Sequence, residues 1–395
     1  MKKLNIIFPP MTWSLLLKSC FFWVARMIIA GYEYLDELPF KNVYFTGIVR
    51  DKLGRKMSKS LGNSPDPIEL IHKFGADGVR VGVLISSPAG NDLPFDTSQC
   101  EQGRNFANKI WNAFRLVSNW DVKDMEQPLS SAVAVSWFEN KLQKTLEEIN
   151  FMYDQYKISE ALMATYKLVW DDFCSWYLEI VKPGYMQPID QKTIRQTEAF
   201  FDTILKLLHP FMPFVSEELW HLISKKESDV MVSSWPKFIG YEQKQLKDFE
   251  LSSEIISSVR NIRKEQNIAS KVKLELFYAG EFKRNKDHDA MIQKMANLSL
   301  FEFTEEKINN SNGFIVSGVE FFIPFGDTID VEAERQKIEQ ELDYSRGFLG
   351  SVQKKLSNER FVNSAPKNVV DMERKKESDA LTKIALLEEK LNTLV

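Results

Sequence analysis

Apolar positions recur about every 3.6 residues through most of the middle of the chain. Such spacing aligns apolar side chains along one face of a helix, so it predicts amphipathic helices. The pairs Pro183-Gly184 and His209-Pro210 separate some of these stretches. The sequence therefore predicts a bundle of at least four long helices. The stretches with this spacing are residues 105–119, 135–155, 158–181, 192–208 and 211–224.

Shorter elements are predicted before this bundle. An apolar run at 21–31 predicts a buried helix, and the β-branched and aromatic residues of 43–50 predict a strand. A polar loop follows. Asp66 and Pro67 then have the pattern of a helix N-cap and first turn, which predicts a helix to about Phe74 and, after a short break, a second one. A loop at 87–97 precedes the bundle.

A small α/β unit is predicted after the bundle. Residues 272–278 alternate between apolar and polar side chains, which is the period of a half-buried strand. The remaining elements expected in this unit are helices at 250–267 and 287–297 and strands at 300–304, 313–316 and 319–323.

The end of the chain carries a near-heptad apolar pattern on either side of a proline-containing turn at 361–366. This predicts two helices of roughly 30 residues in an antiparallel coiled-coil hairpin, on the order of 45 Å long. Basic residues cluster on the hairpin, and two interpretations stay open: a solvated coiled-coil face, or contacts to phosphates. The clusters are Lys354-Lys355, Arg360, Lys367 and Arg374–Lys376.

Composition narrows the class of protein. The 395 residues carry 51 Lys and Arg against 55 Asp and Glu, a formal charge of −4, which excludes a histone-like polycation but not local basic patches. Three cysteines and four histidines without ligand spacing predict neither a disulfide framework nor a metal site. Lys18 and Arg26 interrupt the apolar N-terminal run, so no membrane span is expected. A reducing, cytoplasmic location is expected.

The clearest chemical signal is the run Lys56-Met57-Ser58-Lys59-Ser60, which lies between a predicted strand and a capped helix. Two lysines three residues apart on a loop with flanking glycines are suited to closing over a triphosphate, because each ammonium is a compact charge on a flexible stem. Such a contact accelerates a reaction most when it forms as charge builds on departing pyrophosphate. The two serines add short hydroxyl donors. A lone pair of lysines at this spacing would more often be a solvated loop.

The whole string from Gly54 to Asn63, G-R-K-M-S-K-S-L-G-N, resembles the signature loop of the class I aminoacyl-tRNA synthetases. Within this class the chain is most similar to the valyl-tRNA synthetase family, over about residues 21–395. A zinc tail typical of many isoleucyl relatives is absent from the sequence. The other segments that carry the resemblance are F-F-W-V-A-R-M at 21–27, the stretches at 66–80 and 87–92, the start of the bundle at 104–113, and N-E-R-F-V with A-P and V-V at 358–370.

The resemblance implies a mostly α chain in five segments. These are an aberrant N-terminal segment (1–20), the C-terminal part of an α/β nucleotide-binding catalytic domain (21–97), an anticodon-binding helical bundle (98–240), a small α/β junction domain (241–330) and a coiled-coil tRNA-binding arm (331–395). The implied function is ATP-dependent activation of valine and its transfer to tRNA(Val), with Mg²⁺ assisting, by a monomer. A free-standing, non-catalytic tRNA-binding module is the alternative.

Two of the departures from the family indicate the C-terminal part of a larger enzyme, inactive alone. The second phosphate motif of the class, of the type His-x-Gly-His, does not occur, and the editing domain is missing. Residues 1–20 fit nothing in the family. The string that relatives carry before Phe21, read one nucleotide out of frame, gives Pro9–Cys20, so we hypothesise out-of-frame translation there. Thr46 stands where many relatives carry His, which puts an adenine contact at this position in doubt.

The resemblance also assigns roles to single residues. Lys59 and then Lys56 are the expected catalytic lysines, and Lys56 through Ser60 the expected ATP-binding loop. Trp23 corresponds to a residue beside the valine pocket, with a plain core tryptophan as the alternative. Asp92 and Asp96 are read as loop caps rather than an acid–base pair. The residues expected to contact tRNA, through aromatic stacking, guanidinium planes and charge, are Arg104, Lys109, Trp111 and Arg115 on the bundle and Lys354, Lys355 and Arg374 on the arm.

Overall fold

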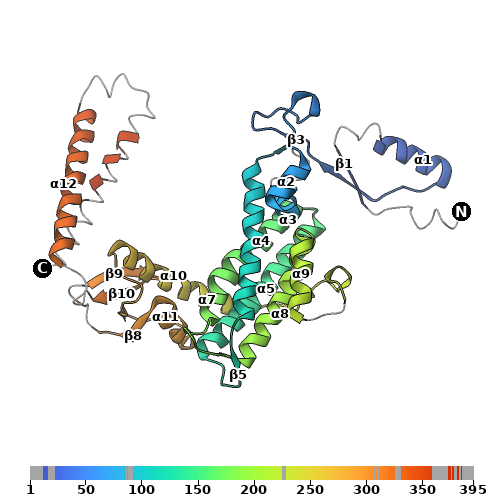
Figure 1. Cartoon of the computed structure of the whole chain (residues 1–395). Helices are drawn as coiled ribbons and strands as arrows, with labels where there is room; N and C mark the ends of the chain where they lie inside the picture. Colours follow the sequence, from blue (N-terminus) through green and yellow to red (C-terminus); the bar gives the residue numbers. More distant parts are fainter. Residues whose placement is uncertain are drawn as a thin grey trace. The chain divides into compact units, whose positions relative to one another are not determined.

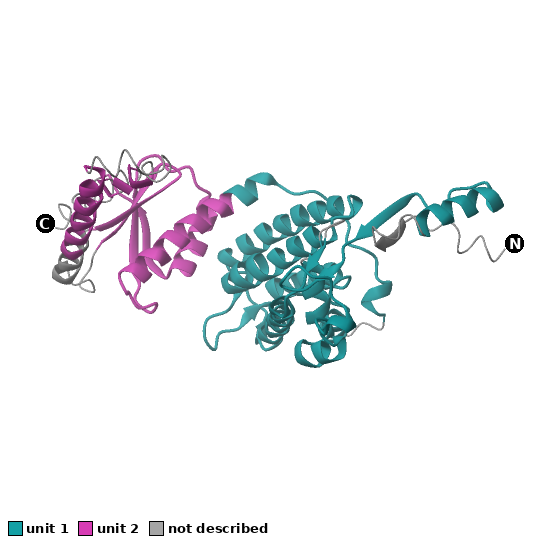
Figure 2. Cartoon of the chain, turned by 90° about the horizontal axis from the view of Figure 1, so that it is seen from above, with its two compact units in different colours: residues 1–247 teal, residues 248–395 magenta. Residues whose placement is uncertain are grey.

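The structure is a computed structural model, and it divides into two compact units, residues 1–247 and 248–395 (Figures 1 and 2). The five-segment division expected from the sequence is finer than this and stays a prediction. For residues 12–16, 224, 331–338 and 341 only the backbone is described. The residues that the structure describes are 12–16, 23–85, 87, 92–224, 228–305, 308, 311–324, 331–357, 372–374, 376–377, 380–381 and 384.

The first unit begins with short parallel strand pairs. The strand expected at 43–50 is divided into β2 (Asn42–Thr46) and β3 (Val49–Arg50). The division arises because each part pairs with a different strand: β2 with β1 (Thr12–Leu16), and β3 with β4 (Leu93–Pro94), both in parallel.

The expectation of a buried helix at 21–31 is wrong. Helix α1 (Ala25–Leu35) forms, but among its residues only Gly31 is buried, and Ile29 and Tyr34 are 66% and 80% exposed. An apolar run predicts burial only where another surface covers it, and the described elements do not cover this one. Its apolar side chains therefore remain on the surface of the described chain.

Two helices follow the lysine-rich loop as predicted. Asp66 caps α2 (Pro67–Phe74) by accepting a hydrogen bond from the backbone N–H of Ile68 at 2.8 Å. Helix α3 (Ala76–Ile85) then packs along the N-terminal half of α4 (Thr97–Ser118) (Figure 1). The approach is close because glycines face each other: a Cβ on Gly103 would lie 2.4 Å from the carbonyl oxygen of Gly78.

The predicted helical bundle is confirmed. The stretch expected at 158–181 is helical throughout, but its middle is a π-helix of ten residues. Phe138 lies at the centre of an aromatic core, with ring centroids 5.2, 5.1 and 5.0 Å from those of Phe173, Tyr177 and Phe200. The bundle consists of α4, α5 (Leu129–Asp154), α6 (Ile158–Lys167), η4 (Leu168–Tyr177), α7 (Leu178–Val181), α8 (Gln191–Leu208) and α9 (Pro213–Ser224), with the short strands β5 (Val122–Lys123) and β6 (Ile189–Asp190) and the turn η5 (Val230–Val232).

The second unit contains the predicted small α/β structure. Its sheet has the strand order β8 (Leu298–Phe303), β7 (Leu274–Ala279), β10 (Val319–Pro324) and β9 (Ser311–Val316), in which β7 and β8 are parallel and the other pairs antiparallel. Arg263 is buried and donates to the carbonyl oxygens of Val272 and Ala296 at 2.8 and 3.0 Å, so it holds this unit together. The elements are α10 (Gln243–Glu265, which begins in the first unit), β7 (Leu274–Ala279), η6 (Lys286–His288), α11 (Asp289–Ala296), β8 (Leu298–Phe303), β9 (Ser311–Val316) and β10 (Val319–Pro324).

The first helix of the predicted arm is α12 (Val331–Leu356). Leu342 and Val352 on it are buried, and so are Ala380 and Ile384 in the described part of the following segment. Lys355 forms an ion pair with Glu373 at 3.9 Å. These contacts fit an antiparallel hairpin, while the expected turn at 361–366 lies outside the described residues. No helix among the described residues is both long and apolar enough to cross a membrane.

Candidate functional site

The lysine loop, residues 54–63, follows β3 and is hydrogen-bonded back to it. The backbone N–H of Met57 donates to the carbonyl oxygen of Val49 at 3.1 Å, and the backbones of Lys56 and Arg50 form an isolated antiparallel β-bridge. The Met57 side chain packs against the buried cluster of Phe74, Phe95 and Cys100. The middle of the loop is therefore anchored in the core that underlies α2 and α4.

Asp51 organises the start of the loop. Its carboxylate accepts hydrogen bonds from the backbone N–H of Leu53 and Arg55 at 3.0 and 2.9 Å, and it pairs with the Arg55 guanidinium at 2.8 Å. The Asn63 amide donates to it at 3.0 Å. The hydrogen bond from Asn63, with those from Arg55 and Leu53, holds the pKa of Asp51 well below its ordinary value. Asp51 is thus a fully ionised anchor at neutral pH.

Asn63 joins the two ends of the loop. Its side-chain oxygen accepts from the backbone N–H of Ser58 at 2.9 Å, and its amide nitrogen donates to Asp51 and to the carbonyl oxygen of Lys56 at 3.3 Å. Between these ends, Ser58 caps the short helix η3 (Lys59–Leu61) by accepting from Leu61 N–H at 3.3 Å. The hydroxyls of Ser58 and Ser60 lie 3.1 Å apart.

The two lysines project from this anchored backbone. Lys56 and Lys59 are exposed, and neither forms an ion pair with any residue that the structure describes. Gly54 and Gly62, which flank them, adopt positive φ angles of 74° and 63°, a region that L side chains rarely occupy. The loop therefore presents two uncompensated positive charges to solvent on a backbone of defined shape.

Asp92 and Asp96 act structurally, as expected. Asp96 caps α4 by accepting from Ser98 N–H at 3.0 Å, and it pairs with Lys52 at 3.0 Å. Asp92 accepts from the backbone N–H of Ile48 at 3.0 Å and pairs with Arg50, so it fastens the two strands that support the loop. The sequence alone does not indicate the roles of Asp51, Asn63 and Arg50, although Asn63 ends the string that resembles the signature loop.

A second set of contacts joins the loop region to the bundle. Asp77 on α3 is buried and accepts from the backbone N–H of Val215 and Phe214 at the start of α9, at 2.7 and 3.3 Å. Burial raises the pKa of Asp77, and these two hydrogen bonds oppose the rise. Arg80 donates to the carbonyl oxygens of Pro210 and Phe211 at 3.0 and 3.2 Å. The region that carries the lysines is thereby fixed to the bundle.

The four residues of α4 expected to contact tRNA lie in different surroundings. Arg104 lies over the Phe74 ring at 5.8 Å, and the ammonium of Lys109 lies 5.5 Å from the centre of the Trp170 ring. Trp111 is half-buried with its ring 6.2 Å from that of Phe114, and Arg115 is exposed. Arg104 and Lys109 thus have contacts within the chain, while Arg115 is the most accessible of the four for a phosphate.

Outside the bundle, the residues expected to lie beside the valine pocket or to contact tRNA are accessible to solvent. Trp23 is 58% exposed, so the alternative that it is a core tryptophan is wrong. On the arm, Lys354 and Arg374 are exposed, and Lys355 pairs with Glu373, a carboxylate that Lys376 also contacts at 2.7 Å. The hydrogen bond from Lys376 is the main cause that lowers the pKa of Glu373.

Three family models match the chain in succession. Residues 8–96 match "tRNA synthetases class I (I, L, M and V)", residues 136–278 match "Anticodon-binding domain of tRNA ligase", and residues 330–395 match "Valyl tRNA synthetase tRNA binding arm". The first match begins inside the segment 1–20, whose out-of-frame origin stays a prediction. Together with the anchored lysine loop and the helical bundle, these matches assign the chain to the class I aminoacyl-tRNA synthetases.

Curated relatives narrow the assignment within this class. Proteins named valine--tRNA ligase are 54% identical in Parabacteroides distasonis, 55% in Phocaeicola vulgatus and 39% in Listeria innocua, each over 95% of this chain. The chain corresponds to the C-terminal portion of a valyl-tRNA synthetase. It spans 43% of the length of the Parabacteroides and Phocaeicola relatives and 44% of the Listeria one. A solved complex of Agrobacterium radiobacter agnB2 LeuRS with tRNA and LeuAMS has 17% identity and a TM-score of 0.46, and covers 79% of this chain and 37% of that one.

Proposed function

We propose that this chain supplies the lysine loop and the tRNA-binding parts of an enzyme that joins valine to tRNA(Val) at the expense of ATP. The observation that carries the proposal is the pair of uncompensated ammonium groups, Lys56 and Lys59, on a loop whose backbone Asp51 and Asn63 hold in place. Such a loop can stabilise charge on a departing phosphate without first breaking ion pairs of its own. The resemblance to valine--tRNA ligases names the reaction.

In this reaction the valine carboxylate attacks the α-phosphorus of ATP, the bond to the bridging oxygen breaks, and pyrophosphate leaves. A hydroxyl of the terminal ribose of the tRNA then attacks the valyl carbonyl of the adenylate and loses its proton, and AMP leaves as the bond between the carbonyl carbon and the phosphate oxygen breaks. Lys56 and Lys59 would bind the pyrophosphate oxygens as negative charge accumulates on them, which favours the transition state over bound ATP. Ser58 and Ser60 would donate hydrogen bonds to the same oxygens.

Mg²⁺ would enter with the nucleotide rather than on this loop. Mg²⁺ requires oxygen ligands, and the carboxylate bonded to the loop, Asp51, is already engaged by Arg55 and Asn63. The described residues of the loop therefore do not fit a resident Mg²⁺ site, and we assign it no step here. A monomeric, cytoplasmic enzyme remains our expectation.

Valine-dependent exchange of pyrophosphate into ATP tests the proposal at two levels. The chain alone is expected to show none, because it lacks a second phosphate-binding motif; robust exchange would contradict this. In the full-length enzyme, we expect Lys59→Ala to lower kcat by roughly 10²–10³-fold with little change in the KM for ATP. Lys52→Ala, a matched lysine that pairs with Asp96 at 3.0 Å, is expected to leave both constants unchanged.

A free-standing tRNA-binding module without a catalytic role is the second candidate. The exposed cations Lys354 and Arg374 on the arm, with Arg115 on α4, support tRNA binding under either function. Removing a phosphate contact is expected to reduce the slope of log Kd against log salt by about one for each lost contact. The full-length Lys59→Ala variant separates the candidates, since a module that only binds tRNA has no kcat to lose.

A further inference from the structure

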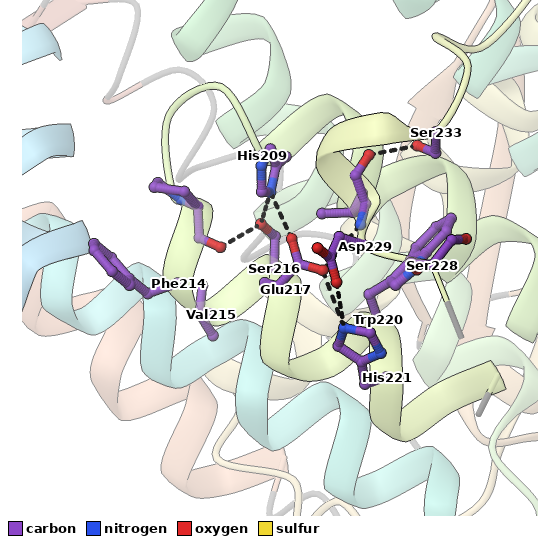
Figure 3. Close-up of polar contacts among 12 residues, drawn as sticks. His209, Phe214, Val215, Ser216, Glu217, Trp220, His221, Ser228, Asp229 and Ser233 are labelled. Atoms are coloured by element: carbon purple, nitrogen blue, oxygen red, sulfur yellow. Dashed lines mark hydrogen bonds and ion pairs between the residues drawn. The ribbon is translucent and has the colours of Figure 1, made fainter. Parts of the chain in front are cut away.

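A histidine and two carboxylates converge on one surface of the first unit, away from the lysine loop in the sequence (Figure 3). Glu217 and His221 lie one turn apart on α9, and Asp229 comes from the segment that precedes η5. Their ligand atoms all lie within 4.8 Å of one another. Neither the lysine loop nor the residues expected to contact tRNA include any of the three.

The distances are those of ligands around one ion. His221 Nε2 lies 3.2 Å from Glu217 Oε1 and 3.4 Å from Asp229 Oδ1. Two ligands bonded at about 2.1 Å to a tetrahedral metal ion are roughly 3.4 Å apart. One imidazole nitrogen and two carboxylate oxygens also form a ligand set that zinc and similar divalent ions accept.

Surrounding hydrogen bonds hold the carboxylates in place. Glu217 Oε1 accepts from the backbone N–H of Val230 at 2.9 Å, and the Trp220 indole donates to the carbonyl oxygen of Ser228 at 2.8 Å. Both bonds fasten the segment that carries Asp229 onto α9, and the buried Val230 side chain adds to this. Outer contacts of this kind orient metal ligands. On the other side of Glu217, His209 Nδ1 lies 4.0 Å from Oε2 (Figure 3).

We propose that Glu217, His221 and Asp229 form a binding site for a single divalent transition-metal ion, with Zn²⁺ as the expected occupant. The side chains are partly exposed, at 29%, 41% and 70%, so the remaining coordination positions are open to water. The ion would cross-link α9 to the segment at 228–233 and stabilise the end of the bundle. This goes beyond the synthetase function and is independent of it, and it departs from the expectation of no metal site that the sequence suggested.

Titration of the untagged, metal-free chain tests the site. Calorimetry with Zn²⁺ is expected to show one saturable equivalent, and Co²⁺ to give a visible absorption spectrum without a thiolate charge-transfer band. The described cysteines, Cys100 and Cys174, are buried. Zn²⁺ at saturation is also expected to raise the Tm, because it binds the folded state.

Variants decide which residues hold the ion. His221→Gln and Asp229→Asn are each expected to weaken Zn²⁺ binding by at least about tenfold. His72→Gln, a control at an exposed histidine on α2, is expected to bind Zn²⁺ as the unmodified chain does. The proposal is overturned if no saturable binding occurs, if His221→Gln and Asp229→Asn bind as tightly as the unmodified chain, or if His72→Gln loses as much affinity as they do.

Discussion

The carboxylate of Asp77 accepts a hydrogen bond from the backbone N–H of Val215 at 2.7 Å, across 138 positions of sequence. The contact lies where α3 meets the first turn of α9, whose backbone N–H groups have no partners within the helix. It joins the region that carries the lysine loop to the last long helix of the bundle.

Replacing Asp77 tests how much this contact stabilises the first unit. Asp77→Ala leaves the partly buried backbone N–H groups of Phe214 and Val215 without the carboxylate that accepts their hydrogen bonds, so we expect the free energy of unfolding to fall by about 2 kcal/mol. Urea unfolding followed by tryptophan fluorescence measures it. The exposed Asp124→Ala is the control and is expected to change stability by less than about 0.5 kcal/mol. Equal effects of the two substitutions would contradict the role of Asp77.

Asn63 is expected to determine the order of the lysine loop. Asn63→Ala removes the hydrogen bonds to Ser58, Asp51 and Lys56, each worth about 1 kcal/mol, so local opening becomes easier. Trypsin cleavage after Lys56 and Lys59 should accelerate by at least about tenfold. Asn105→Ala, on the exposed face of α4, should cleave there at the original rate. Unchanged cleavage in Asn63→Ala would show that the loop is held by other contacts.

The close approach of α3 and α4 depends on Gly103. In Gly103→Ala the new Cβ would lie 2.4 Å from the Gly78 carbonyl oxygen, which is backbone and cannot rotate away. We expect a loss of stability of about 3 kcal/mol, measurable by urea unfolding. Gly184→Ala is the matched control, because its Cβ would meet only the flexible Gln187 side chain at 3.3 Å. Similar stability of both variants would rule out the tight helix contact.

Asp172 gives stability a pH dependence. Burial raises its pKa to about 6, and Lys141, at 3.4 Å, opposes the rise. Between pH 3.8, the ordinary pKa of an aspartate, and about pH 6, the folded chain keeps a proton on Asp172 that the unfolded chain has released. The contribution of Asp172 to stability therefore falls as the pH rises through this range. Asp172→Asn removes the effect.

Urea unfolding at several pH values measures the Asp172 contribution. From about pH 4 to about pH 7, the stability of Asp172→Asn should increase relative to the unmodified chain by on the order of 1–3 kcal/mol. A stability difference that is the same at both ends of this range would mean that the carboxyl titrates alike in the folded and unfolded chain.

Local chemistry made much of the fold predictable. Asp66 caps α2 as expected because the bond it forms, to Ile68, is two residues away. The lysine loop was found because its string is contiguous. The hydrogen-bond partners of Asp77 lie far along the chain, so no local sequence pattern predicts them. The exposure of Ile29 was missed because apolar spacing does not say whether another surface is present.

In the lysine loop, the charged residues were predictable from the sequence, but the hydrogen bonds that hold the backbone of the loop were not. Lys56 and Lys59 follow from the sequence, whereas the interaction of Asn63 with Asp51 depends on a turn that brings residues twelve apart into contact. The π-helix at Leu168–Tyr177 has a slightly longer period than an α-helix, but over ten residues the difference is too small for the apolar spacing to separate the two.

Binding of tRNA tests the central claim most directly, because it uses this chain as it is. Anisotropy of a labelled tRNA(Val) transcript, titrated with the chain at several salt concentrations, should show saturable binding that weakens linearly in log salt. A transcript with a changed anticodon should bind more weakly. The account predicts both results. Absence of saturable binding, or equal affinity for tRNA(Val) and for an unrelated RNA hairpin of the same length, would contradict it.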